Sequence, residues 1–238
     1  MRSYRAPRVA VIMMAAAIPL FAAAVSLDRW AAAVGGRAAL SSIRVIYREA
    51  TIQVAGLTGS IKAWHTADGQ YRKEEKVGPY ATVEVFDGTS AVFRRGTEPP
   101  VKMEGADLQR ARSTAFANAN VLFYVFFPDR RRGELEIEPD GAIVLKPTGG
   151  IDWRVILDSE TALPKTMIHQ EGDKTITVTF VSYETVGGIT LEHEIHRTTG
   201  DPRFTSDIRF TKTVLNPPVE PTLFSVDALT AARDGARH

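Results

Sequence analysis

The sequence predicts a mainly β protein of the α+β class, built as a single curved antiparallel sheet with helices covering its concave face. Segments of alternating apolar and polar residues recur along the chain, as in residues 175–183 and 189–196, and such alternation indicates strands with one buried and one exposed face. Short turn signals separate these segments, which favours sequential antiparallel pairing. One helical segment, residues 106–126, is apolar enough to cover the buried face.

The composition is typical of a globular protein and gives no sign of a nucleic-acid partner. The chain has 238 residues, of which 44% are hydrophobic and 24% are charged, and its 29 basic residues nearly balance its 28 acidic residues. This balance does not indicate binding to nucleic acid or to an anionic membrane surface. Because the chain has no cysteine, a disulfide or a lipid attached to a cysteine is excluded.

Residues 1–26 have the pattern of a secretory signal peptide. Arg2, Arg5 and Arg8 precede an apolar stretch, and small residues near its end offer cleavage sites. A membrane anchor is the alternative, because the apolar run at 9–25 is at the lower limit for a spanning helix. We therefore expect an exported periplasmic protein, which stays membrane-anchored if the signal is not cleaved.

One domain, residues 27–231, is expected to follow the signal, with a disordered tail at 232–238. Asp28 is a candidate N-cap for a first short helix. About a dozen strands then follow, interrupted by the helix at 106–126. We expect these strands at residues 44–55, 59–66, 70–77, 81–86, 90–95, 134–138, 142–146, 152–159, 165–170, 175–183, 189–198 and 204–215.

The histidines and glutamates near residue 193 suggest a metal site, but strand geometry argues against it. His193 and His196 are three positions apart, so on a strand they point to opposite faces and cannot bind one metal together. Glu192, Glu194 and His196 share a face and could hold a metal. An exposed strand face explains the same pattern, so we expect no metal and no other cofactor.

Other charged clusters have similarly simple explanations. Glu134, Glu136 and Glu138 alternate on one strand and could bind calcium weakly, although a solvated strand face accounts for them. The arginines at 130–132 could meet an anionic head group or a partner, although a solvated loop is the default. The sequence contains no nucleophile elbow, no metalloprotease motif and no phosphate-binding loop, so we do not expect an enzyme.

Aromatic and aliphatic side chains on the predicted inward faces are the strongest candidates for a binding site. They form either a packed core or the lining of a cavity between the sheet and the long helix, and such cavities bind apolar ligands. The candidate lining residues are Trp64, Phe116, Leu122, Phe123, Phe126, Val178, Phe180, Leu191, Ile195, Ile208 and Phe210.

Three stretches of the sequence carry a resemblance to a known family. They are the helix A-V-G-G-R-A-A-L at 33–40, the turn D-S-E-T-A-L-P at 158–164, and the ending from 183 to 224 with its N-P-P stop at 216–218. In these stretches the chain is similar to the LolA/LolB-like superfamily of periplasmic lipoprotein carriers, which includes outer-membrane lipoprotein-sorting proteins. The resemblance, over residues 28–224, implies a half-barrel of about eleven antiparallel strands with helices on its concave face. It also implies a cavity for lipoprotein acyl chains.

Two functions are compatible with these observations. The first is an exported carrier or binding protein that shields an apolar ligand, either a lipid or lipoprotein acyl chains, between sheet and helices. Its partners would be a lipid or an acylated protein and a membrane-bound donor or acceptor, and we expect a monomer. The second is a non-catalytic periplasmic interaction or sensor module whose core is fully packed.

Overall fold

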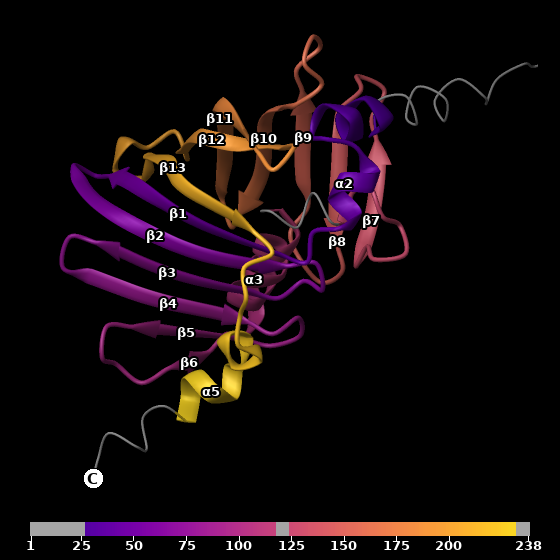
Figure 1. Cartoon of the computed structure of the whole chain (residues 1–238). Helices are drawn as coiled ribbons and strands as arrows, with labels where there is room; N and C mark the ends of the chain where they lie inside the picture. Colours follow the sequence, from indigo (N-terminus) through magenta and orange to yellow (C-terminus); the bar gives the residue numbers. More distant parts are fainter. Residues whose placement is uncertain (1–26, 118–123, 232–238) are drawn as a thin grey trace, which may run out of the picture.

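A computed structural model describes residues 27–117 and 124–231, which form one large open antiparallel sheet and a few helices (Figure 1). The sheet has 13 strands, against the approximate number of eleven that was expected. Twelve of them correspond to the strands predicted by residue range, and the thirteenth is the two-residue β6. The strands are β1 (Val45–Val54), β2 (Leu57–Thr66), β3 (Tyr71–Val77), β4 (Tyr80–Phe86), β5 (Ala91–Arg95), β6 (Val101–Lys102), β7 (Gly133–Ile137), β8 (Ile143–Pro147), β9 (Trp153–Leu157), β10 (Pro164–Glu171), β11 (Lys174–Val186), β12 (Ile189–Thr198) and β13 (Ser206–Leu215).

The strand order places the first and last strands side by side in the middle of the sheet. From β1 the chain runs outward to β6 at one edge, and helix α3 (Gly105–Ala117) then carries it to β7 at the opposite edge. It returns strand by strand to β13, which pairs with β1 so that Ile52 lies opposite Ile208. The turns predicted the sequential hairpins. They did not predict the pairing of β1 with β13, which joins segments more than 150 residues apart.

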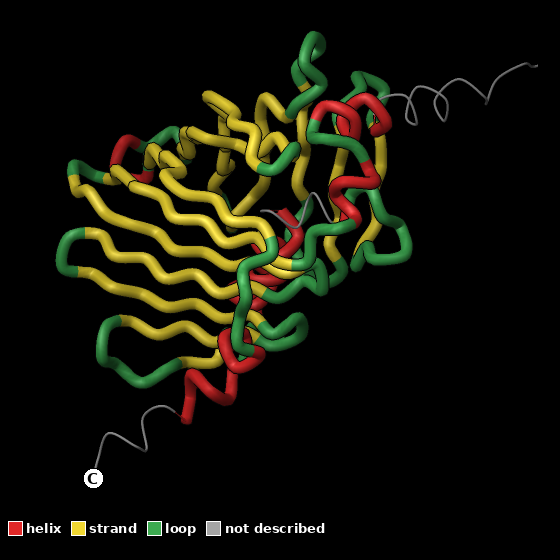
Figure 2. Tube along the Cα trace, in the orientation of Figure 1, coloured by secondary structure: helices red, strands yellow, loops and turns green. Residues whose placement is uncertain are grey.

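The sheet bends strongly around α3. Figure 2 shows β7–β10 running steeply across the direction of β1–β6, which is the cumulative result of strand twist over a large sheet. Helix α3 lies inside this bend and packs on both β4 and β8. Its Ala111 and Ala115 are buried against Tyr71 and Phe86, and small side chains here allow the helix to approach the strands closely.

The first helical residues, 27–33, and α2 (Arg37–Ser41) cover the other part of the concave face. Trp30 is 1% exposed and meets the ring of Phe126 edge to face, with 5.2 Å between the ring centroids. Leu40 and Ile46 are completely buried in the same cluster. Burying an aliphatic or aromatic side chain of this size contributes about 1.5–3 kcal/mol, so this cluster is a main source of stability.

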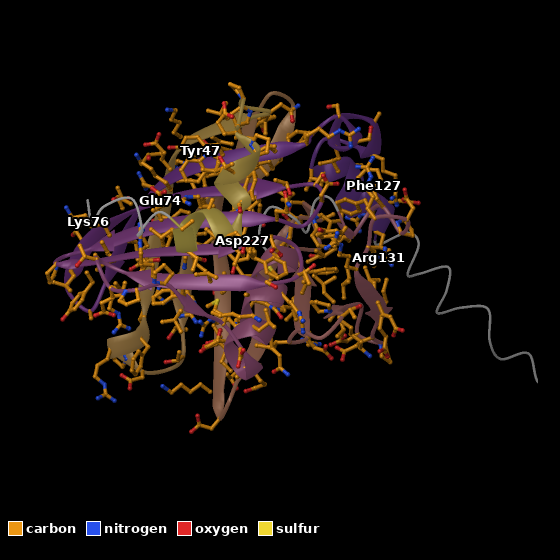
Figure 3. The ribbon with its side chains drawn as sticks, turned by 90° about the horizontal axis from the view of Figure 1, so that it is seen from below. Tyr47, Glu74, Lys76, Phe127, Arg131 and Asp227 are labelled. Carbon is orange, nitrogen blue, oxygen red and sulfur yellow. The ribbon has the colours of Figure 1, made fainter. Side chains whose placement is uncertain are left out.

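The sequence predicted helices on the concave face. One further helix lies on the convex face. Helix α5 (Val226–Ala231) packs its Leu229 against Val85 and Val92, which belong to the convex face of β4 and β5. Figure 3 shows Tyr47 and Glu74 on the same side of the strands as α5. The alternation of β4 places Val85 on the convex face because Glu84 and Phe86 point into the concave side.

Helix α3 forms the first part of the helix predicted at 106–126. Residues 118–123 lie outside the described residues, residue 124 is helical, and the chain at 125–126 forms a bend. Arg131 holds this bend, since its guanidinium donates hydrogen bonds to the carbonyl oxygens of Tyr124 (3.2 Å) and Val125 (2.6 Å). Figure 3 shows Arg131 close to Phe127. Arg132, which also belongs to the arginines considered for a partner surface, donates to the carbonyl of Gly88 at 2.9 Å. Arg131 and Arg132 therefore both have structural roles.

Candidate functional site

The middle of the concave face carries an apolar strip that contains no residue from any described helix. Strand alternation produces it, because residues at even positions of β1 share a face with their partners on β2 and β13. Ala50, for example, lies opposite both Ile61 and Phe210. The apolar strip consists of Ala50, Ile52, Ile61, Ala63 and Val77, bordered by Val54, Ile208 and Phe210.

The apolar strip forms one wall of a hollow of about 550 Å³. This volume is in the range of 300–1,000 Å³ that is typical of small-molecule sites. The facing wall includes Trp30 from the first helix and Arg110 and Thr114 from α3. Residues of β9–β12 complete the lining, among them Trp153, Met167, His169, Val178, Phe180, Tyr183, Glu192, Ile195 and Arg197.

A buried arginine lies at the base of the apolar strip. Arg48 is 3% exposed, and its guanidinium lies 3.3 Å from the ring centroid of Phe210. It donates to the carboxylate and to the backbone carbonyl of Glu192, and its Nε donates to Thr213 at 3.3 Å. Burial lowers the pKa of Arg48, while Glu192 and Glu184 act in the opposite direction. An ion pair of this kind is costly to break from one side, because the remaining charge is left without its partner.

Two further polar groups, His65 near Arg48 and Tyr71 stacked on His65, lie on the concave face. Burial lowers the pKa of His65 to about 3, and the nearby charges of Arg48 and Lys73 lower it further, so this imidazole is neutral at physiological pH. Burial also raises the pKa of Tyr71 well above its usual value, and the carboxylate of Glu84, which accepts the hydrogen bond of the Tyr71 hydroxyl, adds to this effect.

The apolar strip continues to exposed side chains at one end of the sheet. The turns β1–β2, β3–β4 and β5–β6 lie together at this end, on the left of Figure 1. Cross-strand pairing places Leu57 on the same face as Val54, Tyr80 on the same face as Val77, and Val101 on the same face as Phe93. These three side chains are 40%, 62% and 63% exposed. With Phe204, which is 44% exposed and lines the hollow, they form what we call the apolar rim.

Five of the residues predicted to line a cavity face the hollow: Val178, Phe180, Ile195, Ile208 and Phe210. Phe116, Phe126 and Leu191 lie instead in the packed core, each 2% exposed. Leu122 and Phe123 are outside the described residues.

Trp64 is on the opposite face, which corrects the prediction. It pairs with Tyr47 across β1–β2, with 4.7 Å between ring centroids, on the convex side. Its neighbours Ala63 and His65 point inward, so strand alternation turns Trp64 outward.

Strict alternation fails in β11 and β12, unlike in β2, and this adds Glu192 and Tyr183 to the hollow. The pairing passes from Phe180–Ile195 to Ser182–Glu194 and then to Tyr183–Glu192, so each strand gains one extra residue. Phe180 and Tyr183 therefore both face inward. The sequence had placed Glu192 on the exposed face with Glu194 and His196. No turn residue or glycine marks these irregularities, so the pattern alone did not predict them.

The remaining metal candidates do not converge. His196 pairs with Asp207 at 2.6 Å and Glu194 with Arg209 at 3.0 Å, while Glu136 and Glu138 pair separately with Lys146 and Arg154. Within residues 27–117 and 124–231, no group of three His, Cys, Asp or Glu side chains is arranged to hold a metal ion. In the same part of the chain, no helix is long and apolar enough to cross a membrane.

Comparison with solved structures identifies the fold. A DUF1329 family protein from Desulfovibrio piger aligns over 87% of this chain and 98% of its own, with a TM-score of 0.56 and 12% identity. A structure described as an outer membrane lipoprotein-sorting protein domain from Vibrio parahaemolyticus covers 87% and 99%, with a TM-score of 0.52 and 11% identity. A LolA superfamily protein from Nitrosomonas europaea covers 86% and 98%, with a TM-score of 0.52 and 9% identity.

The fold is LolA-like. The resemblance read from the sequence is therefore confirmed at the level of the fold. No protein-family model matches the sequence, and no curated protein matches it either. At 9–12% identity the likeness describes the LolA-like architecture alone, so the ligand must be argued from the hollow itself.

Proposed function

We propose that this protein is a non-catalytic carrier or binding protein that shields an apolar ligand, either a lipid or the acyl chains of a lipoprotein. The observation that carries the proposal is the apolar strip, which lines a hollow of about 550 Å³ and continues to the apolar rim. Monomeric proteins rarely leave contiguous apolar surface uncovered unless it binds something. The lipoprotein-sorting description of one structural neighbour agrees with this assignment.

The apolar rim offers a route by which such a ligand would enter. Leu57, Tyr80 and Val101 share the face of the strip, so a chain leaving a membrane or another protein would stay in apolar contact until it reached Ile52 and Val77. A membrane-bound donor or acceptor would meet the protein at this end.

Filling the hollow tests the proposal. Ala63 lines the hollow, and Ala63→Trp would occupy it, whereas Ala81→Trp places the same bulk on the convex face beside Lys76. We expect a fluorescent fatty acid to bind the unaltered protein and Ala81→Trp, and to bind Ala63→Trp at least tenfold more weakly. A photoreactive fatty acid should label peptides containing Ile52, Ile61 or Phe210. Absence of binding by the unaltered protein, together with no lipid in native mass spectra of periplasmic material, would refute the proposal.

The alternative is an interaction or sensor module with a packed core. It is favoured by Phe116 and Phe126, which fill the space under the helices rather than lining a cavity. A partner protein whose binding is unchanged by Ala63→Trp would support this alternative over the carrier.

Export to the periplasm is part of the proposal. It rests on the signal-like residues 1–26, and N-terminal sequencing of the mature protein tests it: cleavage near residues 22–26 is expected. We also propose one domain over residues 27–231 acting as a monomer, which gel filtration with light scattering would check.

A further inference from the structure

The hollow has a polar side as well as an apolar one. Opposite the apolar strip, β9, β10 and β12 contribute Trp153, His169, Glu171 and Arg197 to its lining, and α3 adds Arg110. A ligand with a simple hydrocarbon chain has no use for these groups. Their arrangement therefore indicates which chemical groups the polar end of the ligand carries.

Trp153 and His169 form the centre of this polar side. They are cross-strand partners on β9 and β10, and their rings stack with 3.8 Å between centroids. His169 is 4% exposed, and its Nε2 lies 2.9 Å from a carboxylate oxygen of Glu171. The pKa of Glu171 is lowered, first by this hydrogen bond and then by Arg197, so Glu171 is an ionised acceptor. In the tautomer that this hydrogen bond selects, the proton resides on Nε2 and Nδ1 is a hydrogen-bond acceptor.

Each of the two stacked rings has a buried nitrogen with no hydrogen-bond partner in the described part of the chain. These nitrogens are Nδ1 of His169, an acceptor, and Nε1 of Trp153, a donor. A buried polar atom without a partner is destabilising, and such atoms are rare in folded proteins. Here one donor and one acceptor lie in adjacent side chains that line the same hollow.

Charged donors surround the pair. Arg197 lies 3.6 Å from Glu171 and its side chain is 35% exposed. Arg110 has a side chain that is 41% exposed and is held by Asp107 at 3.0 Å. Both guanidinium groups retain free N–H donors because an arginine has five and the contacts to a single carboxylate occupy few of them. The remaining charges of the hollow are of both signs, with Arg48 and Lys73 accompanied by Glu192, Glu75 and Glu84.

We propose that this polar side is a head-group subsite for the hydroxyl-bearing head of an amphiphile, a polyol such as glycerol or a sugar. A hydroxyl group is both a donor and an acceptor, so a head with several hydroxyls offers a partner to Nδ1 of His169 and another to Nε1 of Trp153. Further hydroxyl oxygens of the same head accept from Arg197 and Arg110. The acyl chain of the amphiphile lies along the apolar strip, so the inference rests on the proposed function and specifies the ligand class.

Two probes with equal acyl chains test the inference: a monoacylglycerol and the corresponding fatty-acid methyl ester, which lacks the hydroxyls. We expect the monoacylglycerol to bind about tenfold more tightly, since one satisfied buried polar atom is worth about 1.4 kcal/mol, a factor of ten. Trp153→Phe keeps an aromatic ring but removes the Nε1 donor with the pyrrole part of the indole, and His169→Phe keeps an aromatic ring but removes Nδ1 together with the Nε2 bond to Glu171. Each should abolish most of the preference while leaving methyl ester binding within twofold.

His196→Phe is the matched control, because His196 is 39% exposed in its side chain and pairs with Asp207 outside the hollow lining. It should retain the full preference. Equal binding of the two probes, or a preference that survives both Trp153→Phe and His169→Phe, would overturn the head-group subsite and leave the carrier function standing. If neither probe binds, the carrier function fails and the subsite with it. Equal loss of both probes in the two variants would show a structural role and also overturn the subsite.

Discussion

Replacing His65 should make the stability of the protein less sensitive to acid. Its imidazole is buried between β1 and β3, stacked on Tyr71 at 5.9 Å between ring centroids, with Arg48 and Lys73 nearby. Its pKa is about 3 in the folded protein and 6.5 as its ordinary value. Because the folded pKa is the lower one, the unfolded chain binds more protons below pH 6.5, and stability falls as the pH falls through the window from 6.5 to about 3.

The size of this effect follows from the two pKa values. Between pH 7.0 and 5.5 the protonation of His65 in the unfolded chain removes about 1.3 kcal/mol from the free energy of unfolding. This figure hardly depends on how far the folded pKa lies below 5.5, since the folded imidazole is neutral throughout that window. Carboxylates that are ionised in both states contribute little there.

Urea unfolding at pH 7.0 and 5.5 measures the effect as a difference between proteins. In His65→Gln and His65→Phe, the loss of stability between the two pH values should be smaller than in the unaltered protein by about 1.3 kcal/mol. Two replacements are needed because each changes packing beside Tyr71 differently, yet both remove the titrating group. If both variants lose as much stability as the unaltered protein, the imidazole is not buried in its neutral form and the reasoning is wrong.

Three further predictions concern the sheet. Arg48→Met should lower the free energy of unfolding by about 2–3 kcal/mol in urea titrations. The loss is smaller than for a fully buried pair because the Glu192 side chain is 23% exposed. Adding Glu192→Gln to Arg48→Met should restore part of the lost stability. Gly59→Ala places a Cβ 2.2 Å from the Lys76 carbonyl oxygen and should cost about 1–3 kcal/mol, and a loss below 0.5 kcal/mol would contradict the close approach of β2 and β3. Tyr80→Ser at the apolar rim should change the free energy of unfolding by less than about 0.5 kcal/mol, yet slow ligand transfer from vesicles severalfold. Val181→Ser is the control, because Val181 is 57% exposed on β11 outside the rim, and it should leave the transfer rate unchanged. Equal transfer rates in the two variants would exclude the rim as the entry route.

Sequence patterns predicted the sheet well because they report local geometry. Alternation predicted the faces of Val178, Phe180, Ile208 and Phe210, and turn residues predicted the order of the hairpins. The D-S-E-T-A-L-P stretch forms a turn in which the Asp158 carboxylate accepts hydrogen bonds from the backbone amides of residues 160 and 161. These features depend on neighbours in the chain, so they can be inferred from it.

The candidate site was less predictable because it depends on where distant segments meet. Trp64 was expected to line the inward face of its strand, yet its position in β2 turns it outward to Tyr47. Glu192 was expected to be solvated, yet the extra residues in β11 and β12 bring it to Arg48. An irregularity in pairing changes which face a side chain occupies, and the single strand sequence contains no signal for it.

The sequence by itself determined the class of fold, the sequential hairpins and the apolar character of the concave face, since each follows from local spacing and turn chemistry. Only the tertiary structure decided that β13 joins β1, that α3 and the first helices leave the middle of this face uncovered, and that Trp153 and His169 stack beside it. The physical reason is that burial and pairing across more than a hundred residues depend on how the whole sheet bends, which no local pattern specifies.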